Sequence, residues 1–326
     1  MDTTRNRLIR ILQEHNTSHV SGQYLSEQLG ISRAAVWKHM KALEADGYDI
    51  DAVPRKGYQV RRSPDKLSKN TLNWQLDTEW IGRKIIFEEE LDSTQVLAKS
   101  LADQGAVHGT VVLADQQLSG KGTKGRNWHS PAGTGIWMSL IIRPDFGPRE
   151  AAQLTLAAAV AIARTFHKQG IKAAIKWPND IYLGDKKLAG ILTEMQAEQD
   201  YIQHIVLGIG ININQTETEI APDIRQKATS LRIETGKEWN RQELIHLIWK
   251  EFEEVYYLYT NKGFQVIRDE WMQYALRLGH RVIATTPSAV FAAVFKGIGE
   301  DGELLLENDD GSIQRLYSAE LEWKEE

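Results

Sequence analysis

The chain has 326 residues, of which 42% are hydrophobic and 25% are charged, and its formal net charge at pH 7 is −5. This length and composition allow two or three packed domains, and the absence of cysteine excludes disulfides, thiolate metal sites and a cysteine nucleophile. The charged N-terminus has no apolar core, and the longest nearly apolar run, 154–163, is far too short to span a membrane; we therefore expect a soluble, cytoplasmic protein with no membrane partner.

The N-terminal segment is basic, whereas the rest of the chain is acidic. Residues 1–62 hold 10 Lys and Arg against 7 Asp and Glu. Apolar spacing predicts helices at 3–15, at 21–30 with Ser21 as N-cap, and at 33–45 with Ser32 as N-cap. Residues 48–60 predict two strands joined by a basic tip, so the segment as a whole predicts a winged helix-turn-helix.

The third helix and the hairpin tip carry the predicted DNA contacts. Because Val36, Met40 and Leu43 form the buried stripe, the opposite face is small, basic and aromatic. Its lysines suit a major groove, and the arginines and lysine of the hairpin suit phosphates. A protein-interaction module with a solvated basic face is the alternative. The predicted DNA-binding residues are Ser21, Ser32, Arg33, Ala34, Trp37, Lys38, Lys41, Arg55 and Lys56.

A polar stretch, 63–70, predicts a linker between domains. A strand is predicted at 84–88, and a helix follows it that begins near residue 92 and ends at about residue 104. Asp92, Ser93 and Thr94 form the N-cap cluster of this helix. The N–H groups and hydroxyls at such a helix start can bind a polar ligand head, and simple capping explains the cluster equally well.

The most unusual stretch is the glycine-rich, basic loop 120–128, between predicted strands at 110–117 and 136–143. It fits G-x-G-x-x-G, but Pro131 and Gly133 exclude the helix that a dinucleotide fingerprint opens, and the residues after Gly125 exclude a Walker A loop. We expect a flexible loop whose glycines free backbone N–H groups and whose three cations neutralise a phosphate or carboxylate. The alternative is a solvated basic loop.

The next segments predict a packed helix at 150–168, a half-buried strand at 171–177 and a hairpin of 181–183 with 187–195. Asp180 and Lys187 can approach each other across that hairpin, either as part of a phosphate site or as a surface ion pair worth under about 1 kcal/mol. A buried strand at 204–214 contains Gly208 and Gly210, and glycine inside a strand indicates the close approach of a ligand or of another backbone.

The C-terminal part predicts two amphipathic helices, 241–261 and 264–274, which we assign to packing. Four short strands follow at 281–285, 290–295, 303–307 and 312–317, separated by Gly-Asp turns. Short strands with such punctuation predict a small β-barrel.

Five motifs, in their order and spacing, resemble the biotin protein ligase family: 92–94, 120–128, 176–180, 187–191 and 208–212. Together with residues 32–38 in a winged helix, they make the whole chain similar to the bifunctional enzyme-and-repressor members of that family. The resemblance implies an α+β fold with an N-terminal winged helix-turn-helix (1–64) and a C-terminal SH3-like β-barrel (278–326). Between them it implies a mixed α/β catalytic domain of the biotin/lipoate ligase, class II synthetase-like type (65–277).

The resemblance implies an ATP-dependent reaction in two steps. The biotin carboxylate attacks the α-phosphate of Mg-ATP, giving biotinoyl-5′-AMP and pyrophosphate, and a carrier lysine then takes the biotinoyl group. The implied partners are the biotin carboxyl carrier protein of acetyl-CoA carboxylase, other biotin-dependent carboxylases, and operator DNA of biotin genes, bound by a homodimer with biotinoyl-AMP as co-repressor. The alternatives are a ligand-sensing transcription factor without catalysis and a lipoate-type acyl ligase.

Residue roles are implied in the same way. The implied biotin-binding residues are Ser93, Thr94, Gln117, Lys121, Gly122, Lys187, Gly190 and Gly208. The implied residues for ATP and the adenylate are Lys124, Arg126, Trp128, Lys176, Asn179, Asp180 and Asn212. Of these, Trp128 is implied to cover the adenine, Asn212 to bond to the adenine edge, and Asp180 also to bind Mg²⁺. Lys187, Lys121 and Arg126 are the implied catalytic residues, because bringing two anions together demands positioning and positive charge.

The loop departs from the family pattern G-R-G-R-x-x-R-x-W at Lys121 and Thr123. Lysine keeps the charge but loses the planar fork, and threonine carries no charge. We predict that biotinoyl-AMP leaves this protein faster than it leaves relatives with arginine at the second position. Thr123→Arg should slow release by about tenfold, the effect of one charged hydrogen bond, in a stopped-flow measurement of the adenylate off-rate. An unchanged off-rate would contradict the prediction.

Overall fold

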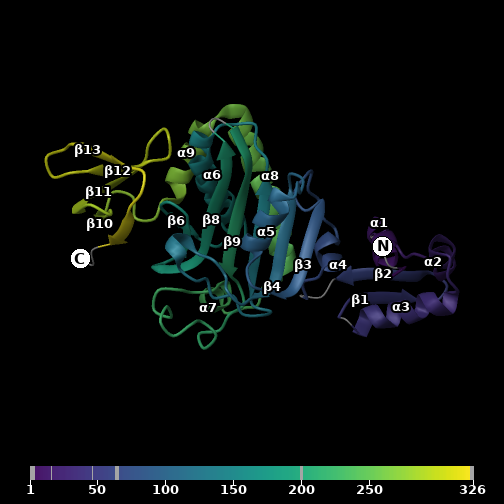
Figure 1. Ribbon diagram of the computed structural model, residues 1–326. Coiled ribbons are helices and arrows are strands. Elements are labelled where there is room, and N and C mark those ends of the chain that lie inside the picture. The colour runs from purple at the N-terminus through teal and green to yellow at the C-terminus, as the bar shows by residue number, and fades with distance from the viewer. Residues whose placement is uncertain (1–3, 16, 46, 63–65, 199–200, 324–326) are drawn as a thin grey trace. The chain divides into compact units, whose positions relative to one another are not determined.

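The computed structural model describes residues 4–15, 17–45, 47–62, 66–198 and 201–323 (Figure 1). Two compact units divide the chain: residues 1–77 with 240–242, and residues 78–239 with 243–326. Among the described residues, no helix is both long and apolar enough to cross a membrane.

The first unit contains three helices followed by an antiparallel hairpin. These are α1 (Thr4–Glu14), α2 (Gly22–Leu29), α3 (Arg33–Ala45), β1 (Asp49–Val53) and β2 (Gly57–Arg62). The Ser21 hydroxyl accepts from the N–H of Tyr24, and the Ser32 hydroxyl accepts from the N–H of Ala35. Both predicted N-caps are therefore confirmed, as is the stop of α2 at the left-handed Gly30.

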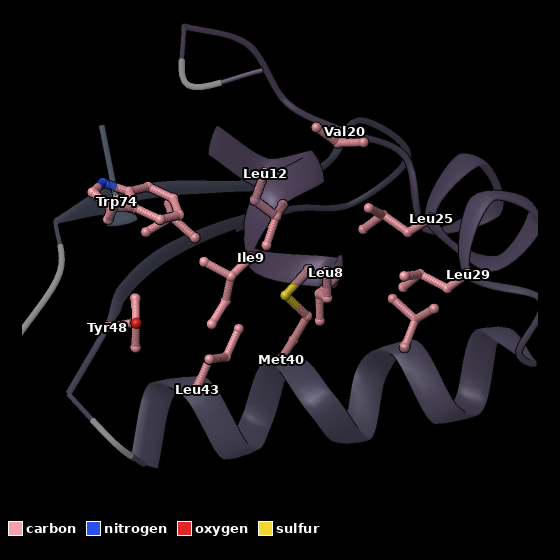
Figure 2. Close-up of a cluster of buried hydrophobic side chains, with 12 residues drawn as sticks. Leu8, Ile9, Leu12, Val20, Leu25, Leu29, Met40, Leu43, Tyr48 and Trp74 are labelled. Atoms are coloured by element: carbon pink, nitrogen blue, oxygen red, sulfur yellow. The ribbon is translucent and has the colours of Figure 1, made fainter. Parts of the chain in front are cut away.

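One apolar core holds this unit together (Figure 2). Leu8 and Leu12 of α1, Leu25 of α2, and Met40 and Leu43 of α3 are at most 1% exposed. The short helix α4 (Lys69–Asn73) begins inside the predicted linker, where Ser68 and Thr71 form a capping box; residues 63–65 of that linker, and the predicted domain boundary at 64/65, lie outside the described residues.

A seven-stranded mixed sheet is the centre of the second unit, with strand order β3-β4-β5-β9-β8-β7-β6 (Figure 1). β3 and β4 pair in parallel and all other neighbours are antiparallel. β6 is shorter than the predicted strand 171–177. The strands are β3 (Lys84–Leu91), β4 (Thr110–Gln117), β5 (Gly135–Ile142), β6 (Ala174–Lys176), β7 (Asp180–Leu183), β8 (Lys186–Glu198) and β9 (Tyr201–Asn212).

Helices cover both faces of this sheet. Gln95 of α5 (Thr94–Asp103) donates a hydrogen bond to Glu194 of β8. Thr155 of α6 (Ala151–Lys168) forms a hydrogen bond with Thr193, the residue before Glu194 in the same strand. Adjacent strand residues point to opposite faces, so α5 and α6 lie on opposite sides. The other helical elements are η1 (Thr123–Gly125), η2 (Pro148–Glu150), α7 (Leu231–Thr235), α8 (Arg241–Lys262) and α9 (Phe264–Tyr274).

The C-terminal segment forms a five-stranded antiparallel sheet with order β13-β12-β11-β10-β14. The four predicted strands are present, and β14 is an addition that the sequence analysis missed. The strands are β10 (Arg281–Thr285), β11 (Val290–Ile298), β12 (Leu304–Glu307), β13 (Ile313–Leu316) and β14 (Glu320–Trp323).

Candidate active site

A group of glycines leaves bare backbone on one face of the central sheet. Gly190 of β8 lies directly opposite Gly210 of β9, and Gly208 lies opposite Ser139 of β5. Opposed residues, and residues two apart on a strand, share a face. All four residues therefore open onto one face, the side that α5 covers, and the glycines form a flat floor there.

Two side chains lie directly on this floor. A Cβ at Gly210 would be 2.5 Å from Trp128 Nε1, and one at Gly190 would be 2.9 Å from the same indole. At Gly208 it would be 2.5 Å from Gln95 Oε1. The indole and the Gln95 amide can occupy these positions only because the strands carry no side chain there. The groups that approach these glycines are thus side chains, whereas the sequence predicted a ligand or another backbone.

A cavity of about 40 Å³ lies beside these two side chains. All eight predicted biotin-binding residues line it. Of the seven predicted nucleotide-binding residues, Trp128, Asn179 and Asp180 line the cavity, and the other four do not. Gln95 and Ser139 also line it. Sequence reasoning missed both of them, although Gln95 directly follows a predicted motif.

The start of α5 supplies a polar group without a protein partner. Ser93 occupies the N-cap position, yet its hydroxyl makes no capping bond, is buried, and has no hydrogen-bond partner within the described part of the chain. Capping therefore does not explain this serine. Because buried polar groups are normally hydrogen-bonded, a free hydroxyl in a cavity wall indicates a ligand contact.

An ion pair also lines the cavity. Lys187 Nζ is 2.6 Å from Asp180 Oδ1, as the predicted hairpin allows, and 5.3 Å from the centre of the Trp128 ring. The ammonium is thus held between a carboxylate and an aromatic face, two favourable contacts for a cation. The arrangement keeps one positive charge fixed beside the glycine floor.

Two predicted nucleotide-binding residues already make hydrogen bonds to protein groups. Asn212 donates to the carbonyl of Thr229 (2.9 Å) and accepts from Gln215 (3.0 Å). Lys176 donates to the Tyr182 hydroxyl at 3.4 Å, and burial lowers the pKa of its ammonium. The Asn212 amide keeps one hydrogen and one lone pair beyond these two bonds.

Loop 120–128 is a narrow hairpin rather than the flexible loop expected from its glycines. The N–H of Gly122 donates to Arg126 O at 2.7 Å, and the N–H of Trp128 donates to Gly120 O at 2.8 Å. The expectation that the Gly122 N–H is free is therefore wrong, because a short antiparallel ladder uses it. A left-handed Lys124 (φ 57°) and Gly125 (φ 73°) close the turn.

Two cations of this hairpin contact the C-terminal sheet. Lys124 Nζ lies 2.9 Å and Arg126 Nη2 lies 3.4 Å from the Glu320 carboxylate of β14. Lys124, and after it Arg126, lowers the pKa of that carboxyl group. These side chains are well exposed, so each pair contributes under about 1 kcal/mol. Neither cation lines the cavity.

The predicted DNA-binding residues lie on the first unit. Trp37 is 53% exposed on α3, and its neighbours Arg33, Ala34 and Lys38 are also exposed. Lys41 forms an ion pair with Glu44 of the same helix. Arg55 and Lys56 are exposed at the tip between β1 and β2, whereas the hydroxyl oxygens of Ser21 and Ser32 serve as helix caps.

Three segments match models of known protein families. Residues 4–59 match an HTH domain, residues 88–212 match the Biotin/lipoate A/B protein ligase family, and residues 278–322 match the Biotin protein ligase C terminal domain. These matches, together with the fold and the cavity, define the class of biotin and lipoate protein ligases, here with a helix-turn-helix segment.

Relatives that match nearly the whole chain identify the family within this class. The "Bifunctional ligase/repressor BirA" of Bacillus subtilis is 43% identical over 98% of both chains, and that of Escherichia coli is 32% identical over 97% of this chain and 95% of its own. A solved biotin protein ligase from Aquifex aeolicus, in complex with biotin and ATP, matches 74% of this chain and 100% of its own with a TM-score of 0.65 and 29% identity. The chain belongs to the BirA family of bifunctional ligase/repressors.

A methyl group on the glycine floor should close the site. In Gly210→Ala the new Cβ overlaps the Trp128 indole, so we expect biotin affinity to fall at least about tenfold, in line with the cost of overpacking a well-packed site. Titration calorimetry on the full chain measures this. A Cβ at the left-handed Gly236 would meet no neighbouring atom within 4 Å, so Gly236→Ala is the control: it should lower stability without changing biotin affinity. Normal biotin binding by Gly210→Ala would contradict the prediction.

Proposed function

We propose that this protein activates biotin with ATP, transfers it to a lysine of a carrier protein, and represses biotin genes through its N-terminal unit. Family membership supports both activities. The observation that carries the reaction is that one cavity is lined both by the partner-free Ser93 hydroxyl and by the Lys187–Asp180 pair. Such a site offers a polar group for a ligand head and a positive charge for reacting anions.

In the first step, two anions must meet. A carboxylate oxygen of biotin bonds to the α-phosphorus of ATP, and the bond from that phosphorus to the oxygen bridging to the β-phosphate breaks, releasing pyrophosphate. Lys187 and Lys121 supply positive charge where the carboxylate and the phosphate meet, and Asp180 holds the Lys187 ammonium in place. The protein's contribution is therefore positioning and charge, and no covalent nucleophile is required.

In the second step, the uncharged amine of a carrier lysine bonds to the acyl carbon and releases one proton to water, giving an amide, and AMP leaves with the electrons of the broken acyl–phosphate bond. A relative from Paracoccus denitrificans, 35% identical over 71% of this chain, is named "Biotin--[acetyl-CoA-carboxylase] ligase". We infer that the carrier domain of acetyl-CoA carboxylase is the acceptor here, with other biotin-dependent carboxylases as further candidates.

Magnesium fits the residues of the site. Among the described residues that line the cavity, Asp180 is the one carboxylate, and no group of three or more His, Asp or Glu elsewhere in the described chain could hold a metal. Mg²⁺ is commonly held by one or two carboxylates together with nucleotide phosphates, so Asp180 is the residue that would hold it. When bound, the ion neutralises phosphate charge.

Three domains are inferred from the elements. The hairpin β1–β2 directly follows α3, which supports a winged helix-turn-helix over residues 1–64. The mixed sheet with helices on both faces supports a class II synthetase-like catalytic domain over 65–277, and the five antiparallel strands β10–β14 support an SH3-like barrel over 278–326.

For regulation, we infer that biotinoyl-AMP promotes homodimerisation and binding to a two-fold operator of biotin genes. The exposed face of α3, with Trp37 and Lys38, is suited to a major groove, and the tip with Arg55 and Lys56 is suited to the adjacent phosphates. The ligand acts by favouring the conformation that dimerises.

Biotin-dependent exchange between ATP and pyrophosphate tests the ligase. We expect exchange with biotin and none with lipoate, and a loss of about 100-fold in Lys187→Met, the scale seen when one group that stabilises developing charge is removed. Lys172→Met, at an exposed lysine outside the cavity, is the control and should retain full exchange. The absence of exchange in the wild type would contradict the proposal that this protein is an enzyme, and exchange with lipoate alone would favour a lipoate-type ligase.

Footprinting of the biotin operon promoter tests the repressor. Protection should require biotin plus ATP, and protection that is indifferent to these ligands would refute the co-repressor role. Lys38→Ala should weaken operator binding, and Lys56→Ala, at the tip assigned to phosphates, should reduce the slope of log affinity against log salt by about 1. The biotin-dependent exchange of both variants should remain that of the wild type.

A further inference from the structure

Gln95 is a buried residue of the cavity wall to which the reaction above assigns no role. It lies in the first turn of α5, is 3% exposed, and rests on the bare backbone at Gly208. Its Nε2 donates to the backbone carbonyl of Val206 at 3.1 Å and to the Glu194 carboxylate at 3.0 Å. A backbone carbonyl can only accept, so the amide nitrogen must point to the strand and the amide oxygen must point to the cavity wall.

This orientation determines where the Ser139 hydrogen lies. Gln95 Oε1 can only accept, and Ser139 Oγ lies 3.0 Å from it, so the single hydroxyl hydrogen of Ser139 is directed to Gln95. Toward its other neighbour, Thr94 Oγ1 at 2.9 Å, Ser139 then presents lone pairs only. One glutamine amide thus commits the Ser139 hydrogen and leaves the Ser139 oxygen able only to accept, from Thr94 or from a ligand.

At the other end of this row of hydrogen-bonded side chains, a backbone group also sets the orientation of an amide, that of Gln117. The N–H of Thr94 donates to Gln117 Oε1 at 2.8 Å, so the oxygen of that amide also faces Thr94. Its Nε2 donates to Ser130 Oγ at 2.8 Å. The one hydroxyl hydrogen of Thr94 therefore goes either to Ser139 Oγ or to Gln117 Oε1, which lies 3.1 Å away.

In the hydrogen-bonded row Gln95–Ser139–Thr94–Gln117, both hydroxyl hydrogens are therefore donated to other protein groups. The oxygens of Ser139 and Thr94 offer a ligand lone pairs and no hydrogen. The nearby Ser93 hydroxyl has no partner and can donate. The lining therefore combines an acceptor surface at Ser139 and Thr94 with two buried donors that have no partner among the described residues, the Ser93 hydroxyl and the Trp128 indole N–H.

We propose that Gln95 is a specificity-determining residue: by fixing the direction of the hydrogen bonds through Ser139 and Thr94, it makes the cavity wall select a ligand head that donates N–H groups. A cyclic urea matches this wall, because its two N–H groups face acceptors and its carbonyl can accept from a hydroxyl such as that of Ser93. A dithiolane ring has no hydrogen to donate. This inference rests on biotin being the substrate, as proposed above.

The test compares biotin with the two isosteric cyclic carbamates in which one ureido N–H is replaced by a ring oxygen. Titration calorimetry on the full-length protein gives the affinity ratio of biotin to each carbamate. In the wild type the ratio should be at least about 30-fold for the regioisomer whose oxygen faces the wall, because lone pairs then oppose lone pairs.

In Gln95→Leu and Gln95→Met the Ser139 hydroxyl is free to rotate and donate, so the ratio should fall below about fivefold even if biotin itself binds more weakly. Using two replacements of different shape guards against the misfolding of one of them. Glu194→Gln is the matched control: it removes the charge beside Gln95 but leaves Val206 O to orient the amide, so the wild-type ratio should persist.

A ratio in the two Gln95 variants equal to that of the wild type would overturn the assignment, and so would a wild-type ratio near one. A fall in the ratio confined to the Gln95 variants would establish it. If the wild-type protein bound neither biotin nor the carbamates, the proposed function itself would be contradicted. That result can be told apart from a failure of the Gln95 assignment, in which biotin still binds.

Discussion

The site depends on bare backbone at Gly190, Gly208 and Gly210. Glycine inside a strand costs about 0.5–1 kcal/mol relative to alanine, because it has more freedom to lose and packs nothing. At these positions the missing side chains let an indole and an amide lie directly on the sheet. The cavity, the Lys187–Asp180 pair and the polar chain at the start of α5 are all arranged around that floor.

Charge is divided between the inside and the outside of the site. Lys121 and Lys187 line the cavity, whereas Lys124 and Arg126 of the same hairpin contact Glu320 of β14. In this structure the ammonium of Lys124, the cation next to the neutral Thr123, contacts Glu320 of the C-terminal sheet. The same contacts tie the hairpin to a carboxylate that lies 196 residues from Lys124 in the sequence.

The uncharged polar groups that line the cavity act through the direction of their hydrogen bonds. Backbone groups set the orientation of both end amides, Gln95 through Val206 O and Gln117 through the Thr94 N–H. A chain oriented at both ends leaves little freedom in the middle, because each hydroxyl has one hydrogen to place. Selectivity for a hydrogen-donating ligand head then follows from the wall itself.

The sequence by itself determined the local elements and the identity of most cavity residues. Capping and apolar spacing are short-range effects, so the caps at Ser21 and Ser32 and most strands could be predicted, and motif order identified all eight biotin-binding candidates that line the cavity. The roles of those residues remain predictions.

Only the tertiary structure decided which groups face one another. Gln95 meets partners 44 and 111 residues away, and Asn212 uses both ends of its amide within the protein. Strand β14, and with it the Glu320 contact, was missed although β12 and β13 are equally short, because Gly-Asp turns precede those two strands and residues 317–319 before β14 carry no such turn signal. Hydrogen-bond direction and ion pairing depend on distances between segments, and strand register and packing set those distances after the local elements have formed.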